Sequence, residues 1–109
     1  MNQETGPQLV FESEFDDRTA FEAEMKGWFS AAAVRLPGGR VVPVCFFDPI
    51  RLSQDVTFAF ERGQSCFTEP GLIVVPKITV ECMVKAVLQC FAEGYFDQYT
   101  AGEDHDSAE

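Results

Sequence analysis

The feature that most limits the possible folds is a pair of apolar runs joined by a turn signal. Residues 28–36 and 40–47 are rich in Val, Phe and Ala, and Pro37-Gly38-Gly39 separates them. Apolar runs of this length on either side of a glycine turn predict a β-hairpin. Pro43 lies inside the second run and has no N–H to donate, so we expect an edge strand or a bulge there. A sheet built on this hairpin is the centre of the expected fold.

Three helices are predicted around the hairpin by capping residues at their starts and glycines at their ends. Asp, Thr and the Asp-Pro pair are favoured before the first helical turn, and glycine is favoured just after the last. In the first helix, Phe21 and Met25 lie one turn apart. The segments are 18–26, which follows the capping candidates Asp16 and Asp17 and ends before Gly27, the stretch from Asp48-Pro49 to Gly63, and the stretch from Thr79 to Gly94.

The third helix has the most regular apolar pattern in the chain. Val80, Met83, Val84, Val87, Leu88 and Phe91 recur at helical spacing. We therefore predict that this face packs on the sheet and that Val84 and Leu88 lie at the centre of the core. Cys82 falls on the opposite side of the helix, near Ala86, and Cys90 borders the apolar face.

Further strands are predicted before and after the hairpin. Residues 8–15 alternate between apolar and polar, which is typical of a half-buried strand. Residues 66–67 and 72–75 are apolar and flank Glu69-Pro70-Gly71, a type II turn sequence.

The resulting order is β-α-β-β-α-β(β)-α, which predicts an α+β fold. We expect a single compact domain with an antiparallel or mixed sheet and helices mainly on one face. A ferredoxin-like sandwich with an added C-terminal helix fits this order, although its first crossover is short. We divide the chain into a flexible N-terminus over 1–7, the domain over 8–96 and an acidic C-terminal tail over 97–109.

The net charge of −10 is concentrated at the two ends of the chain. Residues 1–24 carry a net charge of −6 and residues 97–109 carry −5, whereas residues 25–96 carry +1. This distribution disfavours direct contact with nucleic acid or an anionic membrane surface, which attract clustered Lys and Arg. It favours a basic protein partner. The chain has no apolar run long enough for a transmembrane helix and no signal-peptide pattern, so we expect a cytoplasmic protein.

Catalytic and metal-binding patterns are weak in this sequence. The four cysteines are separated by 21, 16 and 8 positions, and the one histidine, His105, lies in the acidic tail. We therefore expect no metal and no cofactor, and we lean against an enzyme. Asp48 and Asp55 form a carboxylate pair seven residues apart, but Asp48 already has a capping role. Cys82 is the best candidate for a reactive thiol, because a helix N-terminus lowers a thiol pKa.

The function that we expect is a non-catalytic interaction domain that binds a basic macromolecule. Small acidic inhibitors of nucleic-acid-cleaving toxins act in this way, but the analogy rests on charge and size alone. Phe58, Phe96 and Tyr99 are the candidate contact residues, since exposed aromatic side chains often anchor a partner. Two alternatives stay open: a small-molecule-binding or enzymatic domain with a pocket between sheet and helices, and a structural subunit with residues 31–33 or Phe58 at its interface.

Overall fold

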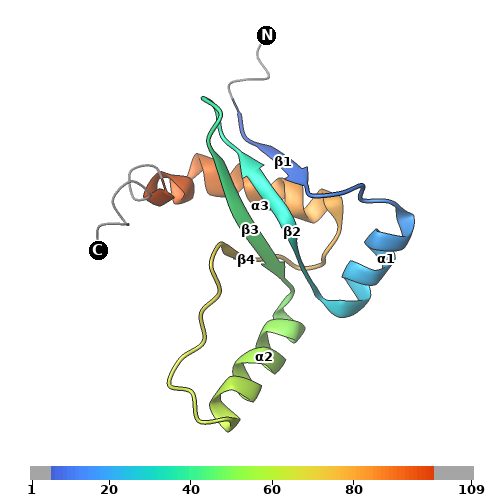
Figure 1. Ribbon diagram of the computed structural model, residues 1–109, viewed down its shortest axis with the longest axis vertical. Coiled ribbons are helices and arrows are strands. Elements are labelled where there is room, and N and C mark those ends of the chain that lie inside the picture. The colour runs from blue at the N-terminus through green and yellow to red at the C-terminus, as the bar shows by residue number, and fades with distance from the viewer. Residues whose placement is uncertain (1–5, 100–109) are drawn as a thin grey trace.

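The computed structural model describes residues 6–99, apart from the side chain of Tyr99. It contains a four-stranded sheet, three α-helices and a short 3-10 helix (Figure 1). The elements are β1 (Gln8–Phe11), α1 (Asp17–Lys26), β2 (Trp28–Arg35), β3 (Val41–Phe47), α2 (Pro49–Glu61), β4 (Leu72–Val74), α3 (Val80–Ala92) and η2 (Tyr95–Tyr99). The predicted α+β class and the mixed sheet are confirmed.

The strands lie in the order β1-β2-β3-β4. The predicted hairpin is present: β2 and β3 are antiparallel, with Val34 opposite Val42. β1 is antiparallel to β2, and β4 is parallel to β3. A ferredoxin-like sandwich requires the strands on either side of the first helix to run parallel, so this arrangement is not formed. The reason is that α1 turns the chain at the end of the sheet and does not cross over its face (Figure 1).

All three helices begin at the predicted capping residues. The Asp16 carboxylate accepts a hydrogen bond from the Thr19 N–H at 2.9 Å, and the Asp48 carboxylate accepts one from the Arg51 N–H at 2.8 Å. The Thr79 hydroxyl accepts a bond of 3.2 Å from the N–H of Cys82. Each bond satisfies one of the amide donors that the first helical turn leaves free, so these residues fix where the helices start.

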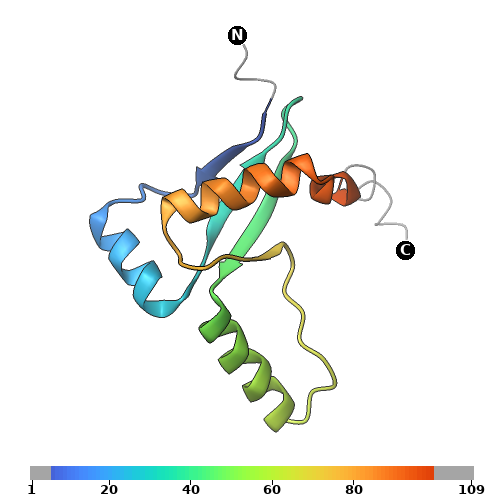
Figure 2. The same ribbon diagram turned by 180° about the vertical axis from the view of Figure 1, so that it is seen from behind.

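The core lies between α3 and one face of the sheet (Figure 2). Val34 and Phe46 face the helix from β2 and β3, and both are completely buried. Met83 and Val87 of α3 are 0 % and 2 % exposed. Phe96 of η2 closes the core at the end of α3 with 2 % exposure. Burial of this apolar surface is the main source of stability for the domain.

The orientation of α3 differs from the prediction. Val84 and Leu88, which we expected at the centre of the core, are 37 % and 51 % exposed. Cys82, Ala86 and Cys90 pack against the core instead. Met83 and Val87 of the predicted face are buried together with these small side chains, whereas Val84 and Leu88 are left outside. The predicted apolar face was therefore wrong in part, because α3 is apolar on two sides and only one side contacts the sheet.

β4 reaches only the last part of β3. Its pairing begins at Cys45, so Pro43 is paired with β2 but lies outside the part of β3 that pairs with β4. β3 is therefore an interior strand and not the edge strand that we expected, and the missing N–H of Pro43 is accommodated where β4 does not pair with β3. The chain joins β3 at Gly71, which has a φ of +71°. A Cβ atom there would collide with the carbonyl oxygen of Pro43, so only glycine fits this approach.

Two parts of the predicted strands, residues 12–15 and 66–67, do not form strands. β1 stops at Phe11, and Phe15 turns back to stack on Phe11 with ring centroids 4.6 Å apart. The segment 66–67 is a loop, and its Phe67 ring packs edge-on against Phe47 at 6.3 Å. Each segment places a half-buried aromatic ring against the body, which accounts for Phe15 and Phe67 without strand pairing.

Candidate functional site: the groove between α1 and α2

Helix α1 packs on the sheet with its small side chains and leaves its large apolar ones outside. Ala23 is buried, whereas Phe21 and Met25 are 64 % and 70 % exposed. Apolar side chains of this size gain free energy when they leave water, so two of them on one helix face mark a surface suited to a partner.

The end of α1 is held directly against the start of α2. Gly27 ends α1 with a φ of +80°, and its carbonyl oxygen accepts a 2.8 Å hydrogen bond from the Asp48 N–H. A Cβ atom on Gly27 would lie 2.9 Å from the Cβ of Arg51. Glycine at this position therefore allows the two helix ends to meet.

A groove of about 270 Å³ separates α1 from α2 beyond this junction. Met25 lines it from α1 and Ile50 lines it from α2, and Ile50 is 71 % exposed. Lys26, Asp48, Arg51 and Gln54 are among the other lining residues. The groove thus combines two exposed apolar walls with polar groups between them.

Arg51 is fixed in place at the side of the groove. Its Nε lies 3.1 and 3.2 Å from the two carboxylate oxygens of Asp55, and its Nη1 donates to the carbonyl oxygen of Lys26 at 3.1 Å. Its guanidinium carbon lies 5.6 Å from the centre of the Trp28 ring, and the Lys26 ammonium lies 6.0 Å from the same ring. Asp55 offsets the charge of Arg51, so this cation adds little positive field to the groove.

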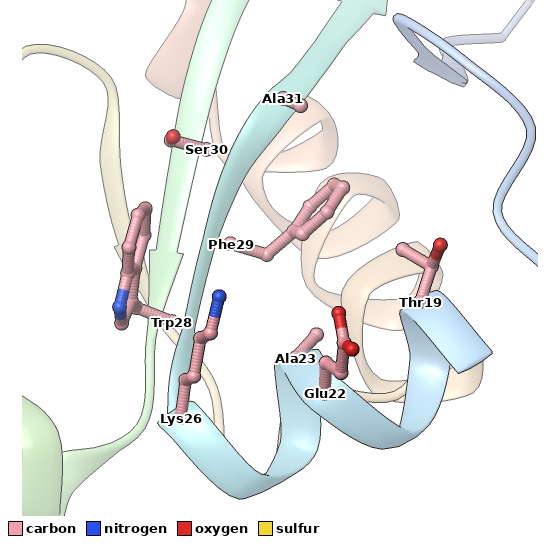
Figure 3. A pocket seen from close by; sticks show the side chains of 8 residues that line it. All are labelled: Thr19, Glu22, Ala23, Lys26, Trp28, Phe29, Ser30 and Ala31. Atoms are coloured by element: carbon pink, nitrogen blue, oxygen red, sulfur yellow. The ribbon is translucent and has the colours of Figure 1, made fainter.

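Two smaller cavities adjoin the site on either side of β2. One, of about 170 Å³, lies between α1 and β2, with Glu22 and Lys26 on its α1 side (Figure 3). In this view Trp28 and Phe29 project to opposite sides of β2. The other, of about 250 Å³, is lined by Trp28, Cys45 and Glu69 among others.

The Cys45 thiol in the second cavity is held in its neutral form. Burial, and to a smaller extent the nearby Glu69 carboxylate, raise its pKa to about 11. A thiol acts as a nucleophile only as a thiolate, so this cysteine is unreactive at neutral pH.

The surface around Phe21 and Met25 is strongly acidic. Residues 12–26 carry six carboxylates, all exposed, against the two cations Arg18 and Lys26. Arg18 pairs with Glu22 at 3.4 Å, which leaves an excess of negative charge on α1 and the segment before it. The Asp16 pKa is lowered by the hydrogen bonds that it accepts at the helix start.

The structure does not gather the site residues that we proposed from the sequence. Phe58 is 56 % exposed on α2, which projects away from the sheet (Figure 1), and Arg62 stacks over its ring at 4.9 Å. Phe96 is buried in the core and has no surface to offer a partner. The side chain of Tyr99 lies outside the described residues. Cys82 is half-buried and packs against the core.

Phe21, Met25 and Ile50 were missed because we expected large apolar residues to face inward. The signal was a second apolar face on the first helix, made of Ala20, Ala23 and the glycine at position 27. A face of small residues allows close packing, and here it is the one that contacts the body.

Within residues 6–99, no group of three or more His, Cys, Asp or Glu side chains is arranged to hold a metal ion. No helix in this part of the chain is both long and apolar enough to span a membrane.

The chain matches no protein-family model, and no curated protein or solved structure shows significant similarity to it. The chemistry of the groove is therefore the basis for assigning a function.

Proposed function

We propose that this chain is a non-catalytic interaction domain that binds a basic protein through the groove between α1 and α2. The observation that carries this proposal is the exposure of Phe21, Met25 and Ile50 beside a cluster of exposed carboxylates with a net negative charge. Apolar side chains in the middle and charged groups around them are the normal anatomy of a protein interface.

The two parts of this surface have separate roles in the proposal. Burial of a fully exposed apolar side chain contributes about 1.5–3 kcal/mol, so Met25 and Ile50 supply affinity. The carboxylates of residues 12–24 attract a partner of opposite charge and speed its association. The partner that fits is an amphipathic segment with apolar side chains flanked by Lys and Arg.

A small-molecule or enzymatic function is less well supported. The groove of about 270 Å³ and the two adjoining cavities are smaller than usual ligand pockets, which hold roughly 300–1,000 Å³. Cys45 is a neutral buried thiol with no histidine among the described residues to activate it.

Affinity capture from lysate of the source cells tests the proposal. The immobilised wild-type chain is compared with a Phe21→Ser/Met25→Ser double variant and with Phe58→Ser as a matched control on another exposed surface. We expect the wild type and the control to retain the same basic protein at low salt and to release it at higher salt.

The double variant should fail to retain that protein while keeping the circular dichroism spectrum of the wild type. Equal capture by all three proteins would show that the groove is not the binding surface. Capture of an acidic or salt-resistant partner would contradict the charge argument.

A further inference from the structure

The cavity that contains Cys45 lies on the face of the sheet that α3 does not cover (Figure 1). Its volume is about 250 Å³, and we call it the Cys45 cavity. Cys45 and Phe47 flank Phe46, which is buried in the core with α3, so their side chains point to the opposite side of β3. Trp28 of β2 pairs with Phe47, and Figure 3 shows Ser30 on the same side of β2 as Trp28. The floor of the cavity is therefore formed by two neighbouring strands.

The charged walls of the Cys45 cavity come from α2 and from the loop that follows it. Arg51 and Asp55 line the cavity from α2, and Glu69 lines it from the loop. Arg51 and Asp55 form an ion pair at 3.1 Å, so their charges offset each other. Glu69 is exposed, and no further cation is among the lining residues. The lining thus carries one net negative charge.

The Cys45 thiol responds to this negative charge. Its side chain is 5 % exposed, and burial is the main reason for its raised pKa. The Glu69 carboxylate is close enough to raise the pKa of the thiol as well. A carboxylate that disfavours a thiolate in the cavity favours a cation there for the same electrostatic reason. The cavity is therefore suited to a positively charged group.

We propose that the Cys45 cavity receives the side chain of a lysine of the partner protein. This inference rests on the proposed function, which requires a basic partner, and it names the residue by which that partner is anchored. Arg51 lines both the cavity and the groove between α1 and α2, so one bound segment reaches both. The volume of the cavity is below the roughly 300–1,000 Å³ of pockets for whole ligands, which fits a single side chain.

The chemistry of the lining matches both parts of a lysine side chain. A lysine buries its apolar stem and keeps its charged end near water, and here Cys45 and Phe47 supply an apolar floor for the stem. The ammonium has three N–H donors and needs acceptors. The Glu69 carboxylate and the Ser30 hydroxyl are exposed acceptors among the lining residues.

An arginine of the partner fits this lining less well than a lysine does. A guanidinium gains most from a carboxylate that binds it through two oxygens or from an aromatic ring on which it stacks. Arg51 already uses both oxygens of Asp55, at 3.1 and 3.2 Å, and its guanidinium carbon lies 5.6 Å from the centre of the Trp28 ring. The compact ammonium of lysine requires neither.

Titration of the full chain with n-butylammonium, which is the lysine side chain alone, tests the proposal. Amide signals of Ser30, Cys45 and Glu69 in a ¹⁵N-labelled sample should shift and saturate. The neutral n-butanol and the arginine analogue n-butylguanidinium should bind more weakly. Equal or tighter binding of n-butanol would show an apolar hollow without charge selection, and tighter binding of n-butylguanidinium would contradict the choice of lysine, so either result would overturn the proposal.

Glu69→Gln removes the unbalanced charge at an exposed position, so the fold should be unchanged. It should weaken n-butylammonium binding about twofold to fivefold, as expected for loss of an exposed ion pair. Glu93→Gln, a matched change of an exposed carboxylate at the end of α3, should bind as the wild type does. An unchanged affinity in Glu69→Gln, or an equal loss in Glu93→Gln, would overturn the proposal.

A variant of the groove separates this inference from the proposed function. Phe21→Ser/Met25→Ser changes no residue of the Cys45 cavity, so it should bind n-butylammonium as the wild type does. If it also captures the same proteins as the wild type, the proposed function fails and the lysine site stands. If it loses the partner while n-butanol and n-butylammonium bind the wild type equally, the lysine site alone fails.

Discussion

Met25 and Ile50 lie on opposite walls of one groove, and both keep about 70 % of their surface exposed. They come from helices that meet at Gly27, where the Asp48 N–H bonds to the glycine carbonyl oxygen. Two exposed apolar side chains held on a fixed junction, next to the acidic surface of α1, form a surface suited to a protein partner. This relationship is the structural basis of the proposed interaction function.

Reversing charge on α1 should slow association with the basic partner. In Glu22→Lys/Glu24→Lys, two exposed carboxylates become cations, so the attractive field beside the groove weakens. We expect a lower association rate in stopped-flow or surface plasmon resonance, with little change in dissociation. The dependence of the rate on salt should also become shallower. The melting temperature should stay close to that of the wild type, because both residues are exposed.

A charge should destabilise the domain much more at one of two neighbouring valines on α3 than at the other. Val87→Asp would bury a carboxylate in the core at a cost of several kcal/mol, comparable to the whole stability of such a domain, roughly 5–15 kcal/mol. Val84→Asp changes a half-exposed position and should cost about 1 kcal/mol or less, a shift of roughly 4–8 °C at most. Thermal melts followed by circular dichroism compare the two. Equal destabilisation would mean that the other side of α3 faces the sheet.

The cysteines should react with a slow alkylating reagent in a defined order at neutral pH. Cys66 is exposed in the loop after α2 and should be labelled first. Cys82 packs partly against the core and should follow later, contrary to our expectation from the sequence. Cys45 should be labelled last, because it is buried and its pKa is raised to about 11. Peptide mapping at partial labelling gives the order, and early modification of Cys45 would contradict the described packing.

The same thiol should affect stability at alkaline pH. The folded pKa of Cys45 is about 11, above the ordinary value of 9.0, so the folded state holds its proton more tightly than the unfolded state does. Its contribution to stability is fully present below pH 9 and is lost as the pH rises toward 11. Wild type and Cys45→Ala should therefore differ in the slope of unfolding free energy against pH in this window. Parallel curves would show that the thiol is not desolvated.

Deleting residues 100–109 should change binding more than folding. The deletion removes Glu103, Asp104, Asp106 and Glu109 and leaves every core residue of the described structure in place. We expect a melting temperature near that of the wild type and a slower, less salt-sensitive association with the basic partner. A large drop in melting temperature would give the acidic tail a structural role.

Local signals in the sequence were enough to predict the helix starts and the central hairpin. Asp48 and Thr79 cap their helices through bonds within one turn, and Pro37-Gly38-Gly39 allows only a tight reversal. Which side of each helix faces the sheet could not be predicted in the same way, because it depends on residues far away in the sequence. α3 is apolar on two sides, and Val84 and Val87 are equivalent in the sequence until the sheet is present.

The site was hidden for a related physical reason. Met25 and Ile50 belong to separate helices, and their common groove depends on the junction at Gly27. Phe96 is an aromatic residue of the kind that is common at interfaces, but its side chain is buried in the core. The distribution of charge, in contrast, could be read directly, because exposed carboxylates need no partner to be placed.

The single tryptophan offers the most direct test of the central claim. Trp28 lies beside the groove with Lys26 and Arg51 at its ring, so an occupant of the groove should change its fluorescence. The probe is a helical peptide of Leu and Arg, with a Leu and Glu peptide of the same length as control. We expect a saturable change with the basic peptide only, weakened by salt and abolished in Phe21→Ser/Met25→Ser. An equal response to both peptides, or one that the double variant leaves intact, would contradict the account.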